Sequence, residues 1–168
     1  MILIAVGSNL AGPQGSPQAN CEAALVALAQ EGVRVVRRSA WYRSPPWPES
    51  EAARQPWYVN GVIAVETALG PEALLAAMHR VEAAMGRVRG PDTVNAARLI
   101  DLDLIDYDGL VRDAAPTLPH PRLTARAFVL RPLSEVAPAW VHPVTRAPLS
   151  SLLAGLPKDA VAEPISKA

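Results

Sequence analysis

The sequence LIDLDLI at residues 99–105 decides the fold, and it carries two acidic side chains within an otherwise aliphatic run. Five of its seven residues are leucine or isoleucine, and the turn sequence YDG follows at 107–109. This pattern predicts a buried β-strand that enters a tight turn. Because side chains alternate along a strand, Asp101 and Asp103 point to one side, while the aliphatic residues between and beside them point toward the core.

Two carboxylates on one face of a buried strand are costly to keep ionised without partners. One or two divalent cations held between Asp101 and Asp103 would remove that cost. Two other interpretations stay open: the pair could lie on a solvated strand face, or Arg98 could simply pair with Asp101. The basic segment before the strand and the histidine- and arginine-containing segment after it favour a metal site.

Bulk composition excludes several function classes. Among 168 residues, sixteen basic side chains balance sixteen acidic ones, so no net field favours nucleic acid or an acidic membrane surface. A single cysteine, Cys21, excludes an internal disulfide and a thiolate zinc site, and it suits a reducing compartment. The apolar start at 1–6 is too short for a signal peptide or a membrane span. We expect a soluble cytoplasmic protein.

The remaining pattern predicts an α+β fold. Strands and helices alternate as strand, helix, strand, strand, helix, strand, which is the split-βαβ order of ferredoxin-like domains. We expect one domain over 1–168, a sandwich of a mainly antiparallel sheet with helices on one face and active-site loops on the other. Residues 158–168 are predicted to be a frayed tail. The expected strands are 1–6, 33–43, 57–67 and 99–105, and the expected helices begin at Pro17 and Pro71 and end at Gly32 and Gly86.

Polar side chains beside the proline-rich segment 44–48 form a first candidate site. Tyr58 and Asn60 share one face of the strand 57–67, which favours a small polar ligand. The alternative, that both residues only satisfy backbone groups at a strand end, stays open.

Cationic side chains on both sides of the Asp strand form a second candidate site. Residues 87–98 contain three arginines and a Gly-Pro break, which predicts a mobile loop that could close over a phosphate. His120, Arg122 and Arg126 form a further cluster after the strand, although a histidine between prolines can also be purely structural. His79 and Glu82 are neighbours on a predicted helix, and a solvated pair is their default interpretation.

Together these segments resemble the 6-hydroxymethyl-7,8-dihydropterin pyrophosphokinase family of the folate pathway. The family signature, an arginine shortly before Asp-aliphatic-Asp, is found at 98–103. The resemblance extends over most of the chain, in the family's order and spacing. The other matching segments are 7–9 (GSN), 42–46 (YRSPP), 58–60 (YVN), 82–89, and 119–120 with 126–128.

The resemblance implies that pyrophosphate passes from ATP to the hydroxymethyl oxygen of the pterin, with release of AMP, in tetrahydrofolate biosynthesis. It implies that Asp101 and Asp103 hold two Mg²⁺ ions, and that ATP and the pterin are the only partners of a monomer. The implied catalytic residues are Arg87, Arg89, Arg98, Asp101 and Asp103. The implied pterin contacts are Ser44, Pro45, Trp47, Tyr58, Asn60 and Phe128, and the implied nucleotide contacts are His79, Glu82, Arg98, Leu104, Thr117, His120 and Arg126.

The chain also departs from the family pattern. Many relatives carry Trp-Gly-Pro before the signature arginine, where this chain has NAA at 95–97, and Pro121 follows the histidine where a tyrosine is common. Two other functions stay open: a non-catalytic ferredoxin-like ligand-binding module, and another Mg²⁺-dependent nucleotidyl or phosphoryl transferase. The absence of a Gly-x-x-x-x-Gly-Lys sequence excludes a P-loop kinase.

Overall fold

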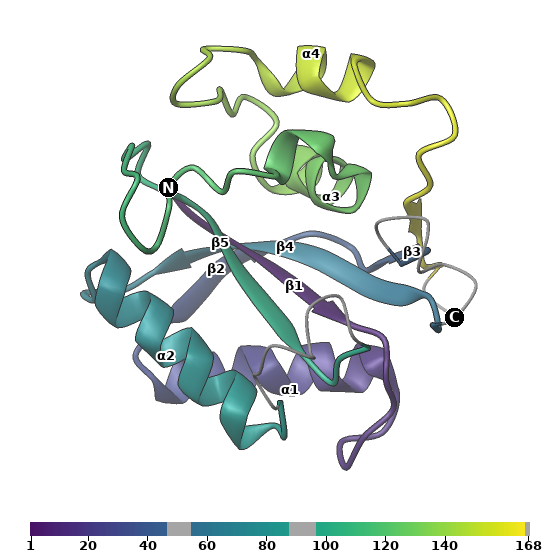
Figure 1. Ribbon diagram of the computed structural model, residues 1–168. Coiled ribbons are helices and arrows are strands. Elements are labelled where there is room, and N and C mark those ends of the chain that lie inside the picture. Colours follow the sequence, from purple (N-terminus) through teal and green to yellow (C-terminus); the bar gives the residue numbers. More distant parts are fainter. Residues whose placement is uncertain (47–54, 88–96, 167–168) are drawn as a thin grey trace.

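The computed structural model describes residues 1–46, 55–87 and 97–166 (Figure 1). Helices and strands follow one another as an α+β chain, as predicted. Their bounds are β1 Ile2–Ser8, α1 Pro17–Gln30, β2 Arg34–Arg38, β3 Tyr42–Ser44, β4 Tyr58–Glu66, α2 Pro71–Ala84, β5 Asp101–Tyr107, a 3₁₀ turn Leu123–Ala125, α3 Ala127–Val136, α4 Leu149–Ala154 and β6 Glu163–Pro164. None of the helices in these ranges is long and apolar enough to cross a membrane.

The described strands form one antiparallel sheet with the order β5-β1-β4-β3-β6, and β2 pairs with the same edge of β4 as β3. The predicted antiparallel sheet is therefore confirmed. The register of the central strand β1 decides the site, because Gly7 lies opposite Asn60 of β4 and also opposite Asp101 of β5. Asp101 and Asn60, both singled out in the sequence, therefore lie in one row across three strands, with Gly7 between them.

Alternating side chains give the sheet two buried faces. On one face Ile4, Val6 and Ile63 pack against α1 and α2 (Figure 1). Helix α1 starts where the sequence predicts, because the Ser16 hydroxyl accepts the Ala19 N–H at 3.2 Å and Pro17 occupies the first turn. Leu102 and Leu104 of β5 belong to this core, so Asp101 and Asp103, which alternate with them, face the opposite side, where Ile105 packs in the second core.

The opposite face requires a correction to the predicted architecture. We expected helices on one face only, but α3 covers part of the other face and α4 packs against α3 (Figure 1). Val129, Leu130 and Leu133 of α3 are fully buried against Leu3 and the same face of β4. Local pattern did not predict α3 because its ten residues include Pro132 and follow a proline-rich segment, both of which argue against a helix.

The end of the chain requires a second correction. Residues 158–166, expected to fray, return to the sheet after α4, and Glu163 and Pro164 pair with Arg43 and Tyr42 as strand β6. A two-residue strand whose partner lies about 120 positions earlier has no local sequence signal, so its polar composition suggested a loose tail. Pairing with the β3 edge supplies the backbone partners that a frayed tail would take from water.

Candidate active site

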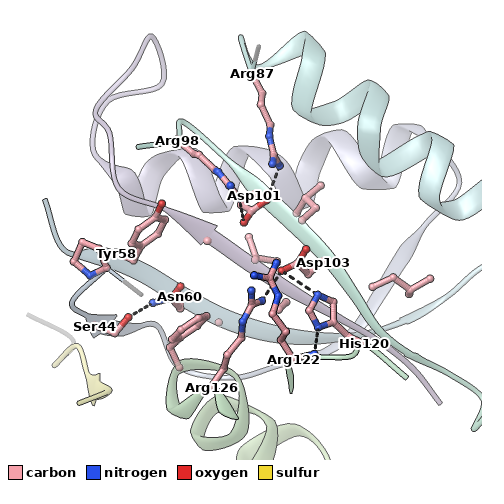
Figure 2. A pocket seen from close by; sticks show the side chains of 18 of the residues that line it. Ser44, Tyr58, Asn60, Arg87, Arg98, Asp101, Asp103, His120, Arg122 and Arg126 are labelled. Atoms are coloured by element: carbon pink, nitrogen blue, oxygen red, sulfur yellow. Dashed lines mark hydrogen bonds and ion pairs between the residues drawn. The ribbon is translucent and has the colours of Figure 1, made fainter. Parts of the chain in front are cut away.

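A cavity of about 420 Å³ lies on the α3 side of the sheet, within the range of small-molecule sites (Figure 2). Its walls come from β1, β4, β5, the end of β3, the start of α3 and the segment 116–122. Ala5 and Gly7 line the middle of its floor. A Cβ atom at Gly7 would lie only 3.1 Å from the Asn60 amide oxygen, so the small residue leaves room for the row of polar groups.

Asp101 lies between two arginines (Figure 2). Arg87 Nη1 lies 2.5 Å from Asp101 Oδ1, and Arg98 Nη1 lies 2.6 Å from Oδ2. The pairing of Arg98 with Asp101, left open by the sequence, therefore exists in the structure. Gly86, with a φ of 92°, ends α2 and turns the chain so that Arg87 points toward β5.

Asp103 lies one pleat further along the same face and has its own cationic neighbours (Figure 2). Arg126 Nη1 donates to Asp103 Oδ2 at 3.0 Å, and His120 Nε2 lies 3.9 Å from the same oxygen. Burial lowers the pKa of His120 below its ordinary value, an effect that the Asp103 carboxylate opposes. A neutral imidazole and a guanidinium therefore border this carboxylate at neutral pH.

The two carboxylates suit Mg²⁺ bound together with a nucleotide. Among the described residues no group of three or more histidine, cysteine, aspartate or glutamate side chains could hold a metal ion by itself. Mg²⁺ is ordinarily bound by one or two protein carboxylates and completes its shell with water and substrate phosphates. The side chains of Asp101 and Asp103 are 21% and 32% exposed and line the cavity, where such an ion would replace their arginine partners.

The other end of the cavity is neutral and polar. Asn60 Nδ2 donates to Ser44 Oγ at 2.8 Å, and both side chains are buried (Figure 2). Tyr58 lies on the same face of β4, as predicted, and burial raises the pKa of its phenol, which therefore stays protonated. Phe128, in the first turn of α3, lines the same end, with the Arg126 guanidinium 5.5 Å from its ring centroid. An aromatic face beside paired hydroxyl and amide groups suits a flat heterocycle.

Most of the residues named from the sequence reach this cavity. His79, Leu104 and Thr117 line it, as do Pro45 and the charged residues described above. Trp47 and Arg89, like most of the expected loop 87–98, lie outside the described residues.

Glu82 is the exception, because it lies behind β5 and does not line the cavity. Its carboxylate is fully buried, accepts the Leu102 backbone N–H at 2.8 Å and pairs with Arg87. Leu102 is the residue between the two aspartates. Glu82 therefore holds β5 and Arg87 in place. Its burial contradicts the expected solvated position on the helix, and its role as a nucleotide contact stays a prediction.

Two further residues belong to the site, although no role was predicted for them from the sequence. Asn9 is buried after β1; its Oδ1 accepts the Arg98 N–H at 2.7 Å, and its Nδ2 donates to Gln55 Oε1 at 3.2 Å. Gln55 itself lines the cavity. Asn9 thereby joins the signature arginine to Gln55, three residues before β4 begins. The sequence GSN at 7–9 was the available signal, because a buried asparagine after a strand needs partners.

Comparisons with known proteins agree with one another. Residues 3–138 match the family model described as 7,8-dihydro-6-hydroxymethylpterin-pyrophosphokinase. A 2-amino-4-hydroxy-6-hydroxymethyldihydropteridine pyrophosphokinase of Methylorubrum extorquens is 45% identical over 118 residues, covering 67% of this chain and 69% of its own length. A protein of the same name from Pseudomonas aeruginosa is 38% identical over 163 residues, 95% of this chain and 94% of that one.

A solved structure of a Plasmodium falciparum HPPK-DHPS triple mutant has the same fold. The TM-score is 0.69 at 13% sequence identity, over 91% of this chain. This chain spans 43% of the length of that longer chain. At this identity the likeness supports the ferredoxin-like architecture alone.

Proposed function

The chain belongs to the 7,8-dihydro-6-hydroxymethylpterin-pyrophosphokinase family, and we propose that it transfers pyrophosphate from ATP to 6-hydroxymethyl-7,8-dihydropterin in folate biosynthesis. The hydroxymethyl oxygen of the pterin attacks the β-phosphorus of ATP. The bond between that phosphorus and the oxygen that bridges to the α-phosphorus breaks, AMP leaves, and the hydroxyl proton passes to solvent. The products are AMP and the pterin pyrophosphate.

One observation carries this proposal: the acidic and neutral ends of the cavity face each other across Gly7. In the β1 registers, Asp101 and Asn60 flank the same glycine. A triphosphate at the aspartates and a heterocycle at Asn60 would therefore place the two reacting atoms within one cavity. Bringing two substrates together in this way supplies much of the rate enhancement in phosphoryl-type transfer.

Asp101 and Asp103 would hold Mg²⁺, and we propose two ions. When bound, these ions neutralise charge on the phosphates and orient the triphosphate. Arg87 and Arg98, together with Arg89, would then bind phosphate oxygens. Positioned cations of this kind stabilise the charge that develops as the bridging bond breaks.

At the pterin end we assign contacts by chemistry. Asn60 can both donate and accept hydrogen bonds at the pterin edge, and Ser44 fixes its amide. Phe128 can stack on the ring, Pro45 lines the same cavity, and Trp47 stays a predicted pterin contact. At the nucleotide end, His79, Leu104 and Thr117 line the cavity beside Arg126 and His120.

The nucleotide product tests the proposal directly. Purified protein is incubated with ATP and Mg²⁺, with and without 6-hydroxymethyl-7,8-dihydropterin, and the nucleotides are separated by chromatography. We expect AMP, in equal amount to pterin pyrophosphate, only when the pterin and Mg²⁺ are both present. Formation of ADP would support another Mg²⁺-dependent transferase, and no nucleotide turnover would support a non-catalytic binding module. Monomeric state and cytoplasmic location stay predictions.

A further inference from the structure

The last ten described residues, 157–166, lie outside the family match, which ends at 138, yet they pack beside the candidate active site. Figure 1 shows this segment descending from α4 to the β3 edge of the sheet. We call residues 157–166 the tail. Its contacts go to two separate elements, β3 and α3, and each of these elements supplies a wall of the cavity.

The contacts with β3 are those of an added strand. The Ile165 N–H donates to the Trp41 carbonyl at 2.7 Å, and Glu163 lies opposite Arg43 in the antiparallel register. Arg43 Nε and Nη2 both donate to Glu163 Oε2, at 3.0 and 2.7 Å. Strand β3 ends at Ser44, whose hydroxyl accepts from Asn60, so the tail borders the segment that positions this pair.

The contacts with α3 depend on one arginine. Arg131 Nη1 donates to the Ala162 carbonyl at 3.0 Å, and its Nη2 donates to the Ala160 carbonyl at 2.9 Å. Ala162 is 1% exposed and packs in one cluster with Tyr42 of β3 and Ala127 of α3, with Phe128 against the same cluster. The methyl group of Ala162 therefore fills the space between the two walls.

We propose that the tail is a positioning strap that sets the separation of Ser44 and Phe128, and thereby the fit of the pterin end of the cavity. This inference rests on the proposed function. The Tyr42 hydroxyl also donates to Glu135 Oε1 at 2.5 Å and so joins β3 to α3. This bond is made by a side chain and does not hold the β3 backbone. The tail adds backbone pairing along β3 up to the residue before Ser44.

If the tail only stabilised the fold, its loss would change the enzyme kinetics in a different way. Loss of general stability lowers the amount of active protein and leaves both Michaelis constants unchanged. Loss of a positioned pterin wall raises KM for the pterin much more than KM for ATP, because most of the nucleotide end of the cavity is built on α2, β5 and the segment 116–122, and only Arg126 of that end adjoins α3. The split between the two KM values therefore separates the two roles.

The first variant is Arg131→Leu in the full chain, with Arg37→Leu as its matched control. Arg37 Nη1 also donates to a backbone carbonyl, that of Val136 at 2.8 Å, but at the end of α3 remote from the cavity. Removing the two Arg131 bonds should raise the pterin KM about tenfold and leave the ATP KM within about twofold. Arg37→Leu should leave both KM values within about twofold. A pterin KM in Arg131→Leu equal to that of its control would overturn the proposal.

A reversible covalent link gives the second test. Because Arg43 and Glu163 are directly opposed across antiparallel strands, Arg43→Cys and Glu163→Cys together suit a disulfide. Cys21 is buried and its thiol pKa is raised to about 12, so it should not interfere. In the Arg131→Leu background, oxidation of the pair should restore the pterin KM and reduction should raise it again. Equal pterin KM in both redox forms would overturn the strap. Absence of AMP formation by the unmodified chain would instead overturn the proposed function.

Discussion

Arg98 and Asp101, three residues apart at the start of β5, are joined by a contact of 2.6 Å between Nη1 and Oδ2. Arg87 lies at the other oxygen, so both oxygens of Asp101 face arginines. Asp101 can hold a cation only if these arginines move away. The same two arginines are proposed to bind the phosphates. Their movement from Asp101 to the phosphates would therefore free the carboxylate for Mg²⁺ and place cations on the triphosphate.

Removing the charge of either aspartate should abolish turnover and preserve the fold. For Asp101→Asn and Asp103→Asn we expect kcat/KM to fall at least about a thousandfold, because the metal-borne charge stabilisation is lost. Both side chains are partly exposed, so circular dichroism should report a native fold. The control is Asp108→Asn. Asp108 is exposed and directly follows the same strand, and asparagine tolerates its φ of 52°. Near-normal activity in either site variant would contradict the assignment.

Arg87→Ala should slow the chemical step more than it weakens pterin binding. Loss of one positioned cation typically costs about a hundredfold in kcat, whereas the pterin end of the cavity does not involve this side chain. Single-turnover rates and pterin titration measure the two effects. The control is Arg80→Ala on α2, the helix that precedes Arg87. The Arg80 side chain pairs with Glu31 at the surface, so this variant should match the unmodified protein. A larger loss in pterin affinity than in rate would place Arg87 elsewhere in the mechanism.

Glu82→Gln should destabilise the protein. Glutamine keeps an oxygen to accept the Leu102 N–H but removes the charge opposite buried Arg87. We expect the free energy of unfolding in urea to fall by about 1–3 kcal/mol. Glu72→Gln, on the exposed side of the same helix and paired with Arg112, should leave the free energy of unfolding nearly unchanged. Equal effects of the two substitutions would show that Glu82 is not a buried anchor.

His142 should make stability depend on pH. Burial, opposed by Asp106, lowers the pKa of His142 below 6.5 in the folded protein, and its Nδ1 accepts the N–H groups of Val144 and Thr145. In the unfolded chain His142 has its ordinary pKa, which is higher than in the folded protein. At pH values between the two, the unfolded chain binds more protons, so the free energy of unfolding falls as pH decreases below about 6.5. His142→Asn keeps an acceptor and removes the titration, so its loss between pH 7.5 and 5.5 should be smaller. An identical loss in both proteins would contradict this role.

Alternation along strands made much of the site predictable from sequence. The shared face of Asp101 and Asp103, and that of Tyr58 and Asn60, follow from a period of two. Contacts distant in sequence did not follow from any local pattern. Glu82 was expected at the surface because its partner, the Leu102 N–H, lies twenty residues later on another element. The tail was expected to fray because its pairing with β3 spans most of the chain.

The central claim is that Asp101 and Asp103 bind magnesium for transfer from a triphosphate. A crystal structure with Mg²⁺ and a non-hydrolysable ATP analogue tests it most directly. The prediction is that the ions lie on the oxygens of both aspartates, with Arg87 and Arg98 moved from Asp101 onto the phosphates. Ions bound elsewhere, with both aspartates still paired to their arginines, would contradict it.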